Sequence, residues 1–217
     1  RNDDELIVLQ DHLGNVADSV HYADDGRWPA EADGTGPSVE LVNPGLDNHS
    51  GMAWRASTGE GTPGAQNSRF AAAAAPLVTQ FKHFPPVPRT GQAVLVTARV
   101  EGLDPILEVS LYYRKAGDAA FTQVILLDDG LSGDGSAGDS VYGGTLPGQP
   151  HETVVEFFLE AQDTAGLVQL VPPTAPAQCT LYLVVDPPAE PGVPVYRLVM
   201  TPADRLELET RDVTSNV

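Results

Sequence analysis

The stretch ETVVEFFLEAQ, residues 152–162, decides the fold of this chain because its apolar and polar side chains alternate. Successive side chains of a β-strand point to opposite faces, so such alternation is typical of a strand with one buried face. The predicted inward face is Val155, Phe157, Leu159 and Ala161, and the outward face is Glu156, Glu160 and Gln162. A shift of one residue would bury the acids, so the pattern also fixes which face points inward.

Two upstream segments, residues 93–100 and 106–114, repeat this pattern. Their predicted inward faces are Val94, Val96, Ala98 and Val100 in the first, and Leu107, Val109, Leu111 and Tyr113 in the second. About seven strand candidates lie between residues 91 and 186, the number that an immunoglobulin-like or fibronectin type III-like sandwich requires. The 19 prolines and 21 glycines among 217 residues interrupt long helices. The sequence therefore predicts a mostly β protein built of immunoglobulin-like β-sandwich modules.

The N-terminal region predicts a β-hairpin followed by long loops. Apolar residues recur at even spacing around Leu6 and Val20, with a glycine-containing turn at residues 11–15 between them. A loop over residues 24–37, a short strand over 38–42 and a second loop over 43–68 follow. Residues 69–90 contain an alanine run and four prolines, which favours an extended connector between modules, with a short helix over the alanines as the alternative.

The last 30 residues predict a short strand and a helix. Residues 193–200 form the strand candidate, and Thr201 is the expected N-cap of a helix that continues to about Arg211. Pro202 takes the first helical position, where its missing N–H costs nothing, and Asp204 completes a capping box. The fold class is thus mostly β, with a short C-terminal strand-helix segment.

The charge, the apolar runs and the cysteine content of the sequence exclude several classes of partner and structure. The 30 acidic and 12 basic side chains give a net charge of −18, which argues against nucleic acid and anionic membrane surfaces as partners. No apolar run is long enough to span a membrane. The single cysteine, Cys179, forms no internal disulfide and is expected to pack as a small hydrophobic residue beside a strand over residues 180–183.

An acidic loop between two strands of the middle module is the strongest candidate for a metal site. Its carboxylates are Asp128, Asp129, Asp134 and Asp139, and glycines at 130, 133, 135 and 138 lie among them. Calcium takes six to eight oxygen ligands in flexible geometry, so a glycine-rich loop with four carboxylates fits a structural calcium site. The alternative is that aspartate and glycine are turn formers in a solvated hairpin. A second acidic loop, with Asp24, Asp25, Glu31 and Asp33, favours a solvated loop over a cation site.

Three aromatic residues, Tyr22, Trp28 and Trp54, are candidates for a sugar- or peptide-binding platform, although burial in a core is the expected role of such residues. Solvent exposure of the rings distinguishes the two roles. The five histidines lack the spacing of a zinc helix, and neither a nucleophile elbow nor a phosphate-binding loop occurs. The chain is therefore not expected to be an enzyme.

The residues of the first module carry a resemblance to a known family. The matching residues are Asp4, Glu5, Leu6, Ile7, Val8, Leu9, Gly14, Asn15, Asp18, Ser19, Val20, Tyr22, Trp28 and Pro29, then Asp33, Gly34, Gly36, Ser38, Glu40, Leu41, Asp47, Asn48, Trp54, Gly61, Thr62, Pro63, Gly64 and Asn67. This pattern resembles the C-terminal half of a lamin tail domain over residues 1–68. The opening strands of that family are missing, so an unpaired sheet edge is expected to invite a second copy of the chain.

The C-terminal residues carry a second resemblance. The matching residues are Val193, Pro194, Val195, Tyr196, Arg197, Leu198 and Met200, then Thr201, Pro202, Ala203 and Asp204. They resemble the first strand and helix of the spore-coat CotH kinase-like family. Bacterial proteins of that kind place a lamin tail domain and an immunoglobulin-like domain ahead of the kinase-like one, which implies an exported or cell-surface bacterial protein. The kinase-like active-site residues would lie beyond Val217.

The expected domains are residues 1–68, the lamin-tail-like half; 69–90, a linker; 91–187, the sandwich; and 188–217, the start of a CotH kinase-like domain or a tail. The expected function is a non-catalytic structural and interaction region that positions a downstream kinase-like domain. The alternative is a carbohydrate- or protein-binding module that targets an attached enzyme to an extracellular polymer. The expected partners are a protein or polysaccharide at the cell surface, with a homodimer formed through the incomplete first module.

Overall fold

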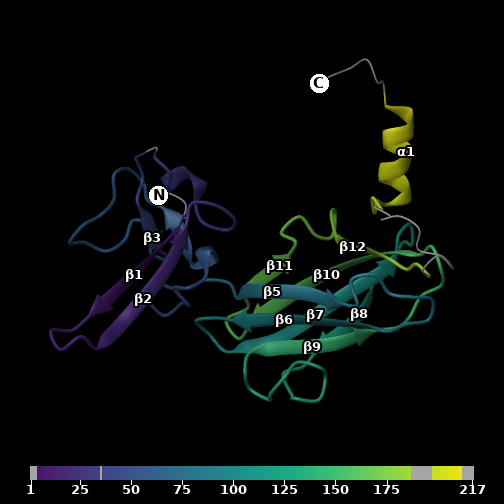
Figure 1. Cartoon of the computed structure of the whole chain (residues 1–217), viewed down its shortest axis with the longest axis horizontal. Coiled ribbons are helices and arrows are strands. Elements are labelled where there is room, and N and C mark those ends of the chain that lie inside the picture. The colour runs from purple at the N-terminus through teal and green to yellow at the C-terminus, as the bar shows by residue number, and fades with distance from the viewer. Residues whose placement is uncertain (1–3, 35, 187–196, 212–217) are drawn as a thin grey trace.

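The computed structural model describes residues 4–34, 36–186 and 197–211 and confirms a mostly β chain with one short C-terminal helix. Figure 1 shows a small N-terminal module, a larger pair of sheets beside it, and the helix α1 apart from both. All strand pairs are antiparallel in the described part of the chain. We call residues 4–76 the first module and residues 77–186 the sandwich.

The sandwich consists of two sheets that face each other. One sheet has the order β5-β6-β9, with β5 at Leu77–Phe84, β6 at Val94–Glu101 and β9 at Val141–Leu146. The other has the order β11-β10-β7-β8, with β7 at Ile106–Lys115, β8 at Thr122–Leu126, β10 at Val154–Asp163 and β11 at Val168–Val171. Strand β12, Thr180–Leu183, pairs with the first half of β10 and β11 with the second half. Together β11 and β12 form one interrupted edge strand, and the arrangement is consistent with an immunoglobulin-like sandwich.

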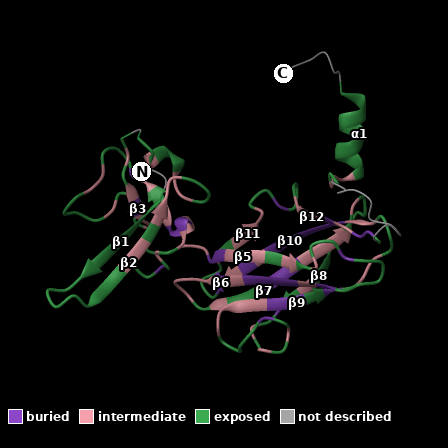
Figure 2. Ribbon diagram, viewed as in Figure 1, coloured by how far each residue is buried: buried purple, intermediate pink, exposed green. Residues whose placement is uncertain are grey.

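The core between the two sheets contains the side chains that the alternation predicted. Val155, Phe157, Leu159 and Ala161 of β10 are at most 1% exposed. The predicted inward face of β6 is equally buried. Figure 2 shows this buried layer between the sheets. The period-two pattern therefore fixed the faces of both central strands correctly, because burial of apolar surface dominates their packing.

Two side-chain predictions in the sandwich are wrong. Leu107 is 62% exposed, because the pairing of β7 with β10 has a register shift at this residue, and Ile106 packs against the core in its place. Glu156, predicted to face water, is buried, and its Oε2 accepts a hydrogen bond of 2.6 Å from Nε of Arg114 on the neighbouring strand. The hydrogen bond from the guanidinium offsets much of the free energy needed to remove the carboxylate from water, which an unpaired carboxylate would lack.

The prediction of residues 69–90 as a connector is wrong for residues 77–84, which form β5. This strand pairs with β6 and places Val78 in the core. A β-bulge between Thr79 and Lys82, with Gln80 at φ 50°, interrupts the regular alternation of side chains along the strand. The bulge and the prolines that follow hid the strand from a period-two analysis.

The first module contains two separate strand pairs. Strand β1, Asp4–Gln10, and β2, Val16–Ala23, form the predicted hairpin, and β3, Val39–Leu41, pairs with β4, Trp54–Ala56. Two 3₁₀ turns, η1 at Ala30–Ala32 and η2 at Gly51–Ala53, lie between strands. The core of this module is a small cluster of Leu46, Ala53 and Leu77. Leu77 belongs to β5, so the cluster joins the first module to the sandwich.

The C-terminal helix α1, Pro202–Thr210, has the predicted capping box. The hydroxyl of Thr201 accepts a hydrogen bond from the backbone N–H of Asp204, whose carboxylate accepts one from the backbone N–H of Thr201. No residue of α1 is buried. The predicted strand over residues 193–200 is wrong for residues 197–200, which form no strand, and residues 193–196 lie outside the described residues.

Candidate functional site

The four aspartates of the acidic loop accept hydrogen bonds from the loop's own backbone. Asp128 accepts from the N–H groups of Gly138 and Ser140 at 2.7 and 3.0 Å, which closes the loop on itself. Asp134, only 5% exposed, accepts from the N–H groups of Gly130 and Ser132 at 2.8 and 3.0 Å. The carboxylates therefore hold the turns of the loop together.

The other two aspartates of the loop act in the same way. Asp129 accepts from the N–H groups of Leu131 and Ser132, each at 2.8 Å, and these bonds hold the pKa of its carboxyl below the ordinary value. The N–H groups of Val141 and Ser136 lower the pKa of Asp139 likewise. Hydrogen bonds to the charged form stabilise a carboxylate, so the loop's own N–H groups stabilise the ionised forms of Asp129 and Asp139.

In residues 4–34, 36–186 and 197–211, no group of three or more His, Cys, Asp or Glu side chains is arranged to hold a metal ion. The calcium site at Asp128, Asp129, Asp134 and Asp139 stays a prediction. To form it, carboxylate oxygens that already accept hydrogen bonds from N–H groups would also have to coordinate the ion. In the second acidic loop, Asp24 and Asp33 line a small cavity of about 230 Å³ beside Tyr22. No helix in the described part of the chain is long and apolar enough to cross a membrane.

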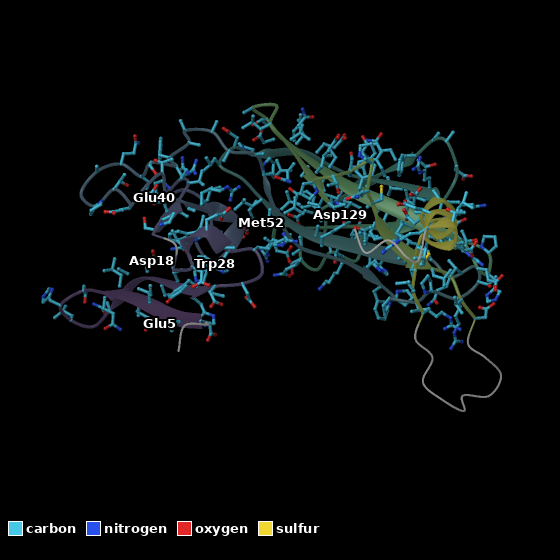
Figure 3. The ribbon with its side chains drawn as sticks, turned by 90° about the horizontal axis from the view of Figure 1, so that it is seen from above. Glu5, Asp18, Trp28, Glu40, Met52 and Asp129 are labelled. Atoms are coloured by element: carbon cyan, nitrogen blue, oxygen red, sulfur yellow. The ribbon has the colours of Figure 1, made fainter. Side chains whose placement is uncertain are left out.

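The structure brings the three predicted aromatic residues together. The ring centroids of Tyr22 and Trp28 are 6.4 Å apart, and those of Trp28 and Trp54 are 5.7 Å apart. All three residues are half-buried. Figure 3 shows Trp28, Met52 and Glu40 in the first module and Asp129 on the sandwich. Because Trp54 packs against the small apolar cluster and also lines a cleft, it takes part in packing and in a surface site.

This cleft, which we call the arginine cleft, has a volume of about 500 Å³. Its lining includes Trp54 and three arginines, Arg27, Arg55 and Arg69, together with one acid, Glu31. No sequence pattern indicates this cleft, because the three arginines are far apart along the chain and follow no periodic spacing. Their concentration in a strongly acidic protein becomes visible only when β4 and the loops on either side are placed in space.

Backbone and sulfur atoms, rather than carboxylates, hold the three guanidinium groups. Nη1 of Arg55 donates to the carbonyls of Met52 and Trp54 at 2.8 and 2.7 Å. Nε of Arg69 donates to the carbonyl of Ala56 at 2.7 Å. Nη1 of Arg27 donates to Sδ of Met52 at 2.7 Å and to the carbonyl of Val78 at 3.1 Å. Fixed guanidinium planes that outnumber the one acid of the cleft, Glu31, are suited to bind an anion.

A buried carboxylate next to the cleft positions one of these arginines. Glu40, 4% exposed, accepts hydrogen bonds from the hydroxyls of Thr62 and Ser68, each at 2.7 Å, and from the N–H of Arg69 at 3.1 Å. The Ser68 hydroxyl contributes most to lowering the pKa of Glu40. These bonds attach the loop over residues 62–69 to β3 and thereby set where the backbone of Arg69 lies.

No protein-family model matches this chain, and no curated protein matches it. Solved structures show partial likeness. A cycloalternan-degrading enzyme from Trueperella pyogenes, in complex with cycloalternan, shares 13% identity over 43% of this chain and 16% of that chain, with a TM-score of 0.32. Astrotactin-2 shares 15% identity over 55% of this chain and 23% of that chain, with a TM-score of 0.34. The chain spans less than a quarter of either structure, and likeness at these TM-scores carries no argument about function.

Proposed function

We propose that this chain is a non-catalytic structural and interaction region of an exported or cell-surface bacterial protein, where it positions a downstream CotH kinase-like domain. The resemblance of residues 1–68 to a lamin tail half, and of the C-terminal residues to the start of a kinase-like domain, motivates this function. The observation that carries it is the apolar cluster shared by both modules. Leu46 and Ala53 of the first module pack with Leu77, the first residue of the sandwich.

A shared apolar cluster supports a spacing role because it resists bending at the junction. Leu103, in the turn after β6, packs against the same cluster, and Arg27 reaches across the junction to the carbonyl of Val78. Modules joined by a flexible linker would instead sample many relative orientations. A region with one fixed orientation can hold whatever follows it at a defined distance from whatever precedes it.

Spin labels on the two modules test this proposal. Labels at exposed Thr58 and Asp118 should give a narrow distance distribution, and Leu46→Ser should broaden it, because a hydroxyl in the small cluster weakens the junction. Leu131→Ser, at a side chain that is 89% exposed, serves as the matched control. A broad distribution in the unaltered protein would contradict a spacing role.

A second candidate function is binding of a carbohydrate or protein, which would target an attached enzyme to an extracellular polymer. The observation that favours it is the arginine cleft with its half-buried tryptophan. Sites that recognise ligands combine an aromatic surface with a few fixed polar groups, and this cleft has both.

We also propose that the hairpin β1–β2 mediates self-association. Leu6, Ile7 and Leu9 are 59%, 58% and 63% exposed, and their side chains alternate between the two faces of the hairpin. An exposed apolar edge strand can pair with another copy of the chain. Light scattering over a range of concentrations should show dimers. A monomer at every concentration would overturn this proposal.

Calcium binding to the acidic loop is tested by calorimetric titration of chelator-treated protein and by its melting temperature. Binding heat and a raised melting temperature, both lost in Asp134→Ala and Asp139→Ala, would establish the site. No heat and no shift would leave the four aspartates as ligands of the loop's own N–H groups.

A further inference from the structure

Basic side chains outnumber acidic ones in the arginine cleft, whereas acidic side chains outnumber basic ones in the chain as a whole. The whole chain has 30 acidic and 12 basic side chains, whereas the cleft lining has three arginines and one acid, Glu31. Among the described residues, none of the three guanidinium groups forms an ion pair with a carboxylate. A concave site lined by three positive groups and one negative group attracts an anion, and the acidic surroundings disfavour anions elsewhere on the surface.

The guanidinium groups are held in place before any ligand arrives. Arg55 is fixed by two carbonyls, Arg69 by the carbonyl of Ala56, and Arg27 by the sulfur of Met52 and the carbonyl of Val78. Each uses one nitrogen for these bonds, so the other N–H groups of each fork remain for a ligand. Because the side chains are already ordered, binding loses less conformational entropy than it would at mobile arginines.

The same hydrogen bonds argue against a peptide that adds as a strand. Residues Ala53 and Ser57 are the hydrogen-bonded positions of the β3–β4 pairing, so the carbonyls of Trp54 and Ala56 point to the outer edge of β4. Those two carbonyls accept from Arg55 and Arg69, so an incoming strand would have to displace both arginines to use them. A ligand that brings its own anionic groups, and needs no backbone ladder, fits this edge better.

Trp54 lines the cleft and is half-buried, and its Nε1 already donates to the carbonyl of Asn48 at 2.9 Å. A pyranose ring has apolar C–H faces that pack on an aromatic side chain, while carboxylates on the sugar match the guanidinium fork. The volume of about 500 Å³ lies within the range of about 300–1,000 Å³ for ligand sites.

We propose that the arginine cleft binds a carboxylate-bearing glycan, such as a polyuronic acid, through Arg27, Arg55 and Arg69 with a sugar ring against Trp54. The inference rests on the second candidate function and names its ligand class. It is independent of the spacing role.

Calorimetric titration of the whole chain with a galacturonic acid tetramer tests the proposal. The methyl ester of the same tetramer is the matched neutral probe and should bind at least about tenfold more weakly. Arg55→Gln and Arg69→Gln should each weaken binding of the acid by about tenfold. Lys115→Gln, which removes an exposed positive charge from the sandwich, should change it less than about twofold. Trp54→Phe, which keeps an apolar ring, should weaken the binding of the acid and of its methyl ester by the same factor.

Variants that lose backbone hydrogen bonds must be shown to fold, and circular dichroism provides that check. If Arg55→Gln is misfolded, Arg55→Lys keeps the charge without the fork and should still weaken binding. Equal affinity for the acid and its ester would overturn the carboxylate assignment and leave the binding function standing. Tighter binding of a poly-glutamate peptide than of the glycan would overturn the ligand class. No binding of any probe would overturn both the ligand and the binding function of this cleft.

Discussion

The first module and the sandwich are both antiparallel β structures, but different forces hold them. The sandwich has a cluster of 15 buried apolar residues, whereas the first module shares a cluster of three. The first module relies more on polar contacts, such as the Glu40 carboxylate with its two hydroxyl donors and the Asp18 carboxylate with the amide of Asn48. A short chain segment with few buried apolar residues can thus be ordered by charged hydrogen bonds, at the cost of sensitivity to pH.

The two tryptophans offer a way to follow the two regions separately. Trp28 and Trp54 both lie in the first module, and the chain has no other tryptophan. Tryptophan fluorescence therefore reports on the first module, while far-UV circular dichroism is dominated by the larger sandwich.

The largest expected effect is that of Phe157→Ala on the sandwich. Phe157 is 1% exposed, and its ring contacts those of Phe81 and Tyr182. Its truncation should lower the free energy of unfolding by about 3–5 kcal/mol, because it leaves a cavity in the apolar core. Urea unfolding followed by circular dichroism measures this. Leu131→Ala is the control, and a loss smaller than about 1 kcal/mol for Phe157→Ala would show that the sandwich does not depend on its core as we describe.

A smaller effect, confined to the first module, is expected for Glu40→Gln. The amide keeps the size of the side chain but lacks the charge, and its NH₂ group cannot accept from the Ser68 hydroxyl or the N–H of Arg69. The urea midpoint seen by fluorescence should fall, while the midpoint seen by circular dichroism stays. Exposed Glu60→Gln is the matched control. Equal shifts in both signals would mean that the two regions unfold together.

Acid should loosen the first module before the sandwich core. Hydrogen bonds from Ser68 and Thr62 lower the folded-state pKa of Glu40 below its ordinary value of 4.5, and the Asn48 amide lowers that of Asp18 below 3.8. A lowered folded pKa contributes stability that is complete above the unfolded pKa and is lost as pH falls through the folded pKa. Fluorescence should therefore change below pH 4.5, before the circular dichroism does. If the circular dichroism changed at a higher pH than the fluorescence, the hydrogen bonds of Glu40 and Asp18 would not be what holds the first module together.

The smallest effect is expected in α1, which belongs to neither region. Thr201→Ala removes a capping hydroxyl worth about 1 kcal/mol to the local helix. Because no residue of α1 is buried, the urea midpoints of both regions should stay unchanged. Amide hydrogen exchange in α1 should become faster, and Thr210→Ala, at the other end of the helix, should leave exchange in the first turn unchanged. A shifted midpoint would show that α1 packs on the rest of the protein.

Patterns that act within one element were visible in the sequence. The alternation in β6 and β10 placed their buried faces correctly, and the capping box of α1 followed from Thr201, Pro202 and Asp204. Both depend on residues close together in the chain, where geometry translates directly into spacing. The bulged strand β5 was missed, because Gln80 interrupts the alternation that would reveal it.

The candidate site could be predicted from the sequence only in part. The aromatic residues were identified by type, but their approach to within 5.7 Å of ring separation for Trp28 and Trp54 required the fold. The arginines were not identified, since nothing in the sequence relates Arg27 to Arg55 and Arg69.

The sequence by itself determined that the protein is mostly β, that its central strands bury one face, and that Thr201 caps its C-terminal helix. These properties arise from short-range periodicity and from backbone hydrogen bonding within a few residues. Tertiary structure alone decided that Glu40 is buried with its donors and that the arginines converge beside Trp54. The physical reason is that both arrangements bring together residues distant in the chain. Their contacts depend on how the loops pack against β3 and β4, which no local sequence pattern specifies.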